Sequence, residues 1–194
     1  LGLAGAAALA RAMLPLRPHA GMLPPQDGIR LSKLVLNDVG PRLETGALAR
    51  IGQYVGEPGV FASFAEAVAA MRANSETFGP HSDAQWDQLA RFVYPEQGGQ
   101  WVKHYDLALA QPMAAQTSEE LAAGEQILWR SYDAVDCPIL IVRGEYSDLL
   151  TRATVEEMRQ RNPRAQVHEV RGVGHAPTLM ADDQVAAVAD FLLA

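Results

Sequence analysis

The segment from residue 137 to residue 177 constrains the fold more than any other part of this 194-residue chain. Its apolar run at residues 139–142 is short, β-branched and flanked by proline and glycine, as is typical of a buried parallel strand. A helix beginning at Thr151 or Thr154 follows, and a second strand is expected over residues 166–170. This strand–helix–strand order predicts an α/β fold with a parallel sheet.

An aspartate and a histidine follow the two strands of this unit. Asp148 comes shortly after the first strand, and His175 ends the Gly-x-Gly-His stretch after the second. Ligands of open α/β sheets bind at the edge where the strands end. An aspartate that binds one imidazole nitrogen leaves the other nitrogen available as a general base. From spacing alone, a solvent-exposed loop aspartate and an unrelated loop histidine explain the pattern equally well.

Two segments, VRGEYSDLL and VRGVGHAPTLM, resemble the last two catalytic loops of the α/β-hydrolase superfamily. The segment LVLNDVGP at residues 34–41 is similar to the strand and turn that precede the cap of that family. The resemblance implies the chain order Ser…Asp…His, with Asp148 as the acid and His175 as the base. Some relatives carry the triad acid after the strand that precedes the cap, so Asp38 is an alternative candidate for the acid. Asp148 is preferred because the sequence around Asp38 has the composition of a turn.

The same resemblance predicts where the nucleophile lies. Residues 1–14 are rich in alanine and leucine, and their LGLAG start resembles the segment that follows the nucleophilic serine of the family. We therefore expect a nucleophile upstream of residue 1 and an oxyanion-hole N–H at Leu1. The seven serines of this chain all lie outside any Gly-x-Ser-x-Gly sequence. The chain alone is accordingly expected to be inactive.

The expected fold class is a partial α/β-hydrolase fold with a helical cap insertion. Residues 1–41 and 131–194 would form the core, and residues 42–130 a helical cap in which Ser63 and Ser82 begin helices. Aromatic side chains with a polar group suit an apolar carbonyl substrate. The candidate pocket residues in this region are Phe78, Trp86, Trp101, His104 and Tyr105. Simple packing between helices is the favoured alternative for all five.

Composition excludes several other classes of protein. A net charge of −7 argues against a nucleic-acid partner or an anionic membrane, which would require a basic face. The single cysteine, Cys137, excludes an internal disulfide. No apolar run reaches the length of a membrane span, and a cytoplasmic location is expected. The resemblance implies no metal or organic cofactor, and the oligomeric state stays open.

The combined reading is a hydrolase that acts on an ester or a related carbonyl substrate through a Ser-Asp-His triad. Three alternatives remain. Relatives with an aspartate nucleophile cleave carbon–halogen bonds or epoxides, and others cleave carbon–carbon bonds. The third alternative is a catalytically inactive fragment or association module, whose exposed sheet edge would pair with another chain.

Overall fold

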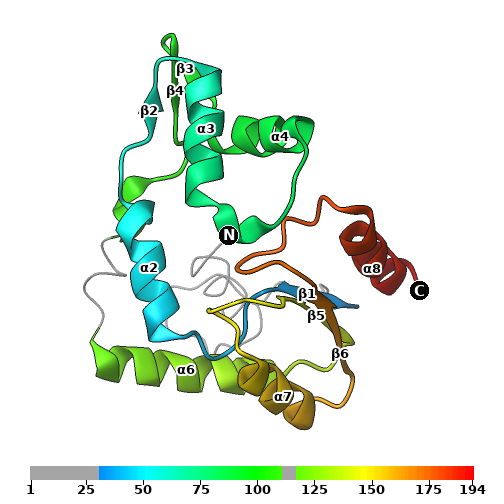
Figure 1. Cartoon of the computed structure of the whole chain (residues 1–194). Coiled ribbons are helices and arrows are strands. Elements are labelled where there is room, and N and C mark those ends of the chain that lie inside the picture. Colours follow the sequence, from blue (N-terminus) through cyan, green and yellow to red (C-terminus); the bar gives the residue numbers. More distant parts are fainter. Residues whose placement is uncertain (1–30, 111–116) are drawn as a thin grey trace, which may run out of the picture.

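The computed structural model describes residues 31–110 and 117–194 (Figure 1). Its main sheet holds three parallel strands in the order β1-β5-β6. The strands are β1 (Leu34–Asn37), β5 (Ile139–Gly144) and β6 (Ala165–Val170). Asn37 pairs with Val142, and Gly144 pairs with Val170, so all three strands end at the same edge. The parallel sheet predicted from the sequence is confirmed.

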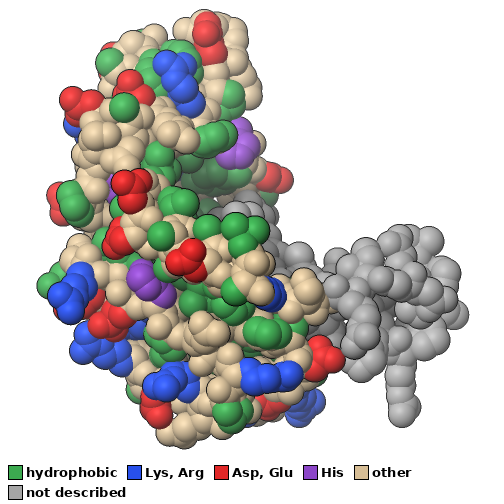
Figure 2. Space-filling model, turned by 90° about the vertical axis from the view of Figure 1, so that its right-hand side faces the viewer, with side chains coloured by type: hydrophobic (Ala, Val, Ile, Leu, Met, Phe, Trp, Pro, Cys, Tyr) green, Lys and Arg blue, Asp and Glu red, His purple; other side chains and the backbone are tan. Residues whose placement is uncertain are grey.

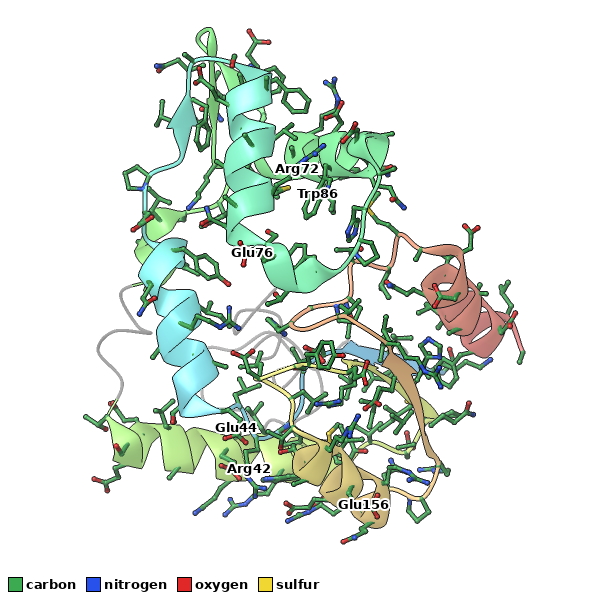
Figure 3. The ribbon with its side chains drawn as sticks, viewed as in Figure 1. Arg42, Glu44, Arg72, Glu76, Trp86 and Glu156 are labelled. Carbon is green, nitrogen blue, oxygen red and sulfur yellow. The ribbon has the colours of Figure 1, made fainter. Side chains whose placement is uncertain are left out.

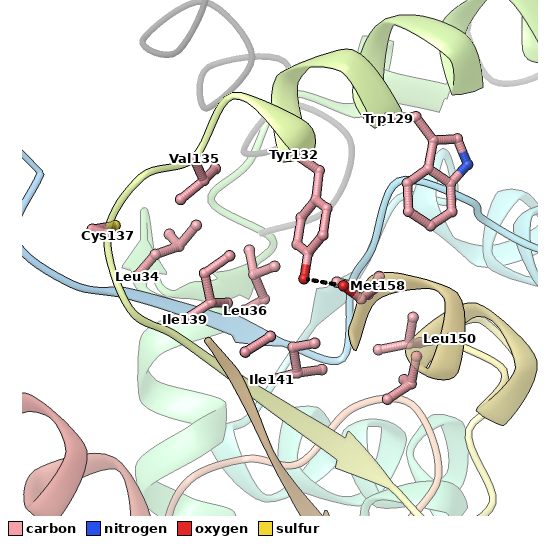
Figure 4. Close-up of a cluster of buried hydrophobic side chains, with 12 residues drawn as sticks. Leu34, Leu36, Trp129, Tyr132, Val135, Cys137, Ile139, Ile141, Leu150 and Met158 are labelled. Atoms are coloured by element: carbon pink, nitrogen blue, oxygen red, sulfur yellow. Dashed lines mark hydrogen bonds between the residues drawn. The ribbon is translucent and has the colours of Figure 1, made fainter. Parts of the chain in front are cut away.

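Helices cover both faces of this sheet. On one face lie α6 (Ser118–Asp133) and α7 (Arg152–Arg161), and on the other lies α8 (Asp182–Leu193) (Figure 1). Every residue of β5 is buried because both of its faces are covered. Ile139 and Ile141 join the cluster with α6 and α7 (Figure 4), whereas Leu140 and Val142 pack with Phe191 of α8. The alternation of side chains along one strand therefore separates two cores.

Most of the region between β1 and β5, residues 45–109, extends above the main sheet in Figure 1 and is called the upper part here. It contains α2 (Thr45–Val55), α3 (Phe64–Asn74), α4 (Asp83–Val93) and the 3-10 turns η1 (Glu76–Phe78) and η2 (Leu107–Leu109). It also contains a small antiparallel sheet of β2 (Val60–Phe61), β4 (Gln100–Val102) and β3 (Glu96–Gln97). Residues 118–130, which were expected in the cap, instead belong to α6, whose Trp129 and Tyr132 pack against the main sheet.

This small sheet corrects the expectation of a purely helical region. Gly98 and Gly99 connect β3 to β4 with φ angles of 61° and 82°. A pair of residues with positive φ makes the tight turn that joins two antiparallel strands, and glycine adopts that conformation without strain. The Gly-Gly pair therefore favours a hairpin here.

The helices of the upper part begin largely where the sequence predicted. Ser82 and Gln85 form a complete capping box at the start of α4. Ser63 accepts the N–H of Glu66 at 3.3 Å, but the Glu66 carboxylate accepts the N–H of Ala62 instead of that of Ser63. Between α3 and α4 the guanidinium of Arg72 lies 5.9 Å from the Trp86 ring centroid (Figure 3). Ala67, Val68 and Met71 of α3 are buried in one cluster with Trp86 and Ala90 of α4, so the upper part has a hydrophobic core of its own.

The buried phenol of Tyr132 gives a prediction for alkaline pH. Its hydroxyl donates to the carbonyl of Met158 at 3.0 Å (Figure 4), and burial raises the pKa of Tyr132 to about 12. An unfolded tyrosine ionises near pH 10, so stability is lost as the pH rises through the interval between the two pKa values. We expect Tyr132→Phe to make this loss shallower, at a cost of about 1 kcal/mol at neutral pH.

Urea unfolding at a series of pH values between neutrality and pH 12 measures the effect. Tyr146→Phe is the matched control, because the Tyr146 side chain is 68% exposed. Equal slopes in the two variants would contradict the prediction.

Candidate active site

His175 lies in the loop that follows β6, at the carboxyl edge of the sheet. Its Nδ1 is 2.8 Å from Oδ2 of Asp38, and its side chain is 20% exposed. In a neutral ring held this way, the proton lies on Nδ1 and is donated to the carboxylate, while Nε2 carries the lone pair. This arrangement equips Nε2 to accept a proton from a reacting group.

Asp38 follows β1 directly and is completely buried. Its φ of 53° lies in the left-handed region, which aspartate tolerates better than most residues. The backbone N–H donates to the carbonyl of Val142 at 2.7 Å, and side-chain Oδ1 accepts the N–H of Gly144 at 3.0 Å. Both carboxylate oxygens are therefore bonded, as a buried charge requires.

The sequence-based preference for Asp148 as the partner of His175 is corrected by this geometry. Asp148 binds Arg50 of α2 with both carboxylate oxygens, at 2.9 Å and 2.7 Å. The hydrogen bond from Arg50 holds the pKa of Asp148 below its usual value. The imidazole of His175 is bonded by the rival residue, Asp38.

The loop after β5 turns the Asp148 carboxylate toward α2. Ser147 Oγ accepts the backbone N–H groups of Leu149 and Leu150, which closes a tight turn around Asp148. The buried guanidinium of Arg143 donates to the carbonyls of Leu150 and Ser147 at 2.8 Å and 3.3 Å. Sequence reasoning did not assign this role to Arg143, although an arginine inside a buried strand is an unusual feature that could have drawn attention.

Gly144 is the point where the loops after β5 and β6 come closest. A Cβ atom on Gly144 would collide with the backbone carbonyls of Val173 and Gly174. Glycine is therefore required so that the loop carrying His175 can cross the end of β5. The same residue donates its N–H to Asp38, so it serves both members of the Asp-His pair.

The five candidate pocket residues lie mainly within the core of the upper part. Trp86 is buried and stacks on Phe78, with ring centroids 6.4 Å apart, and Trp101 of β4 packs against Phe64 at 4.6 Å. His104 is exposed, its Nδ1 is 3.2 Å from the carbonyl of Val93, and Tyr105 is half-buried. These contacts agree with packing, the favoured alternative, and the pocket roles stay predictions.

Leu1, the expected oxyanion-hole residue, lies outside the described residues. In the space-filling view, the surface is hollowed where the upper part meets the lower part, and hydrophobic side chains line this hollow (Figure 2). Within residues 31–110 and 117–194, no three or more His, Cys, Asp or Glu side chains gather as a metal site would require. No helix in those ranges is long and apolar enough to cross a membrane.

The parallel sheet, the Asp-His pair and the loop crossing at Gly144 together define a protein of the α/β-hydrolase type. Residues 2–189 match the model of the alpha/beta hydrolase family, and the chain belongs to this family.

Individual relatives extend the comparison. The chain is 46% identical over 163 residues to a 3-hydroxybutyrate-oligomer hydrolase of Cupriavidus necator, covering 82% of this chain and 56% of that protein. An alpha/beta hydrolase from Novosphingobium aromaticivorans superposes with a TM-score of 0.70 at 30% identity, covering 84% of this chain and 57% of that one. A protein from Rickettsia typhi gives a TM-score of 0.71 at 25% identity, covering 84% and 53%. The chain thus spans little more than half the length of these relatives.

The tight crossing at Gly144 gives a prediction for stability. In Gly144→Ala the new methyl group meets backbone carbonyls, which cannot rotate away as a flexible side chain would. We expect the free energy of unfolding to fall by about 1–3 kcal/mol, the usual cost of overpacking. Denaturant unfolding measures this change.

Gly124→Ala in α6 is the matched control, because a Cβ there meets nothing within 4 Å. An alanine inside a helix should leave stability unchanged or raise it by up to about 1 kcal/mol. If Gly144→Ala were as stable as Gly124→Ala, the close crossing would be refuted.

Proposed function

We propose that this chain supplies the acid and the base of an ester hydrolase, with Asp38 orienting His175 and His175 acting as general base. The observation that carries the proposal is the 2.8 Å contact between His175 Nδ1 and a fully buried carboxylate. A carboxylate in this position fixes the ring tautomer and stabilises the imidazolium that forms during proton transfer. The family to which the chain belongs supports the same roles.

The nucleophile in this proposal is a serine outside the described residues, in the Gly-x-Ser-x-Gly elbow of the family. Nε2 of His175 takes the serine proton as the oxygen attacks the ester carbonyl, and then gives that proton to the departing alkoxide. Water, activated by the same nitrogen, hydrolyses the acyl-enzyme. The N–H of the residue after the serine would stabilise the oxyanion, and Leu1 stays the predicted donor.

The substrate that we propose is a short oligoester of a hydroxy acid. The Cupriavidus necator relative, a 3-hydroxybutyrate-oligomer hydrolase, supports this choice through its 46% identity. The hollow between the upper and lower parts is lined by hydrophobic side chains (Figure 2), and an apolar lining suits the aliphatic part of an ester. In this proposal the upper part, residues 45–109, acts as a cap. The chemistry requires no cofactor.

The decisive comparison is between the two candidate acids, tested in the complete protein. Asp38→Asn keeps the shape of the side chain but replaces the carboxylate by an amide, which favours the wrong tautomer of the His175 ring. We therefore expect kcat to fall by about 10³- to 10⁴-fold. Asp148→Asn removes only a surface ion pair, so kcat should stay within about threefold of wild type. Steady-state hydrolysis of a 3-hydroxybutyrate dimer and of a short-chain aryl ester measures both variants.

His175→Ala should abolish turnover of both esters, and the 194-residue chain alone should show none. A large loss with Asp148→Asn and little with Asp38→Asn would reverse the acid assignment. Activity of the 194-residue chain that disappears with His175→Ala would instead place the nucleophile within this chain.

A further inference from the structure

The loop that carries His175 is held from two sides. From the core, Asp38 binds the imidazole ring, and Asn37 Nδ2 donates to the carbonyl of Pro177 at 2.9 Å. From the opposite side, the segment of residues 77–85, which runs from η1 into the first turn of α4, contacts the same loop through Thr77, His81 and Gln85. This segment begins just after Glu76, which lies below the C-terminal end of α3 in Figure 3. The catalytic loop therefore depends on the upper part as well as on the sheet.

Thr77 makes the contacts closest to the histidine. Its carbonyl accepts the N–H of Gly174 at 2.6 Å, and its hydroxyl donates to the carbonyl of His175 at 3.1 Å. These two hydrogen bonds hold the main chain of the consecutive residues Gly174 and His175. The fit is close, since a Cβ on Gly174 would come within 2.9 Å of Thr77 Cβ. The backbone of His175 cannot shift without breaking at least one bond to Thr77.

His81 and Gln85 extend the contact along the loop. His81 Nδ1 lies 3.0 Å from the carbonyl of Gly79, so Nδ1–H donates there, and Nε2 accepts the hydroxyl of Thr178 at 2.7 Å. Gln85 donates to the carbonyl of Met180 at 3.2 Å. His81 is half-buried in this contact. Thr77 is thus the first of three attachment points between the segment and the loop.

We propose that Thr77 is a positioning residue for the catalytic base. It acts through the main chain of Gly174 and His175, fixing the backbone so that the ring stays bonded to Asp38 with Nε2 aimed at the reacting group. The consequence is that the upper part and the catalytic base move together: a displacement of η1 displaces His175. This role matters for catalysis only if His175 is the general base, so it rests on the proposed function.

The test compares three variants of the complete protein. Thr77→Val keeps the volume of the side chain and the main-chain carbonyl but removes the hydroxyl. Thr77→Ser keeps the hydroxyl. Ser63→Ala is the matched control, because Ser63 caps α3 in the upper part by accepting the N–H of Glu66, far from the loop in sequence and without bonding any of its attachment residues. Two readouts are needed: steady-state kinetics on a short-chain aryl ester, and the proton NMR signal of the His175 Nδ1–H.

In Thr77→Val we expect kcat to fall about fivefold, the worth of one hydrogen bond, with KM within twofold of wild type. The Nδ1–H signal should shift or broaden through faster exchange with water. Thr77→Ser should restore both readouts, and Ser63→Ala should leave both unchanged even where it lowers the melting temperature. Wild-type values of kcat and of the NMR signal in Thr77→Val would overturn the proposal.

The NMR readout separates this inference from the proposed function. If the wild-type protein hydrolyses no ester, the proposed function fails, and the Nδ1–H signal alone then decides whether Thr77 positions the ring. If the enzyme is active and His175→Ala abolishes activity, but Thr77→Val matches wild type in both readouts, only the positioning role is refuted.

Discussion

The buried carboxylate of Asp38 is the interaction on which the rest of this site depends. Asp38 follows β1, its Oδ1 accepts the N–H of Gly144 at the end of β5, and its Oδ2 binds His175 in the loop after β6. One side chain therefore joins the ends of all three parallel strands. A carboxylate with no exposed surface is tolerated only when its oxygens are bonded, so the loops that provide the partners must keep their positions.

The second carboxylate at this edge has a different physical role. Asp148 is about half-exposed and binds Arg50, so water and salt screen the pair and its contribution to stability is small. Its pKa is lowered by Arg50, so what it contributes is present at neutral pH and is lost as the pH falls through the depressed pKa in the folded state. The pair ties α2 to the loop after β5, whereas Asp38 binds the imidazole of His175.

Membership of the alpha/beta hydrolase family gives this geometry a chemical context, and the similarity to a 3-hydroxybutyrate-oligomer hydrolase narrows the proposed substrate to an oligoester. In this proposal the upper part does more than cover the site. Its residues Thr77, His81 and Gln85 bond the loop that carries His175, so the proposed cap and the proposed catalytic loop are in direct contact.

The sequence by itself determined the three strands of the main sheet, the starts of several helices and the place of His175 in the loop after the last strand, because burial patterns, capping residues and a Gly-x-Gly-His turn are local signals. Only the tertiary structure decided which acid meets His175. Two aspartates follow strands that end at the same edge, and the choice depends on loop conformation: a left-handed φ turns Asp38 under the ring, while Ser147 and Arg143 turn Asp148 toward Arg50. The contacts of Thr77 with the catalytic loop join residues almost one hundred positions apart, and no local pattern encodes such a pairing.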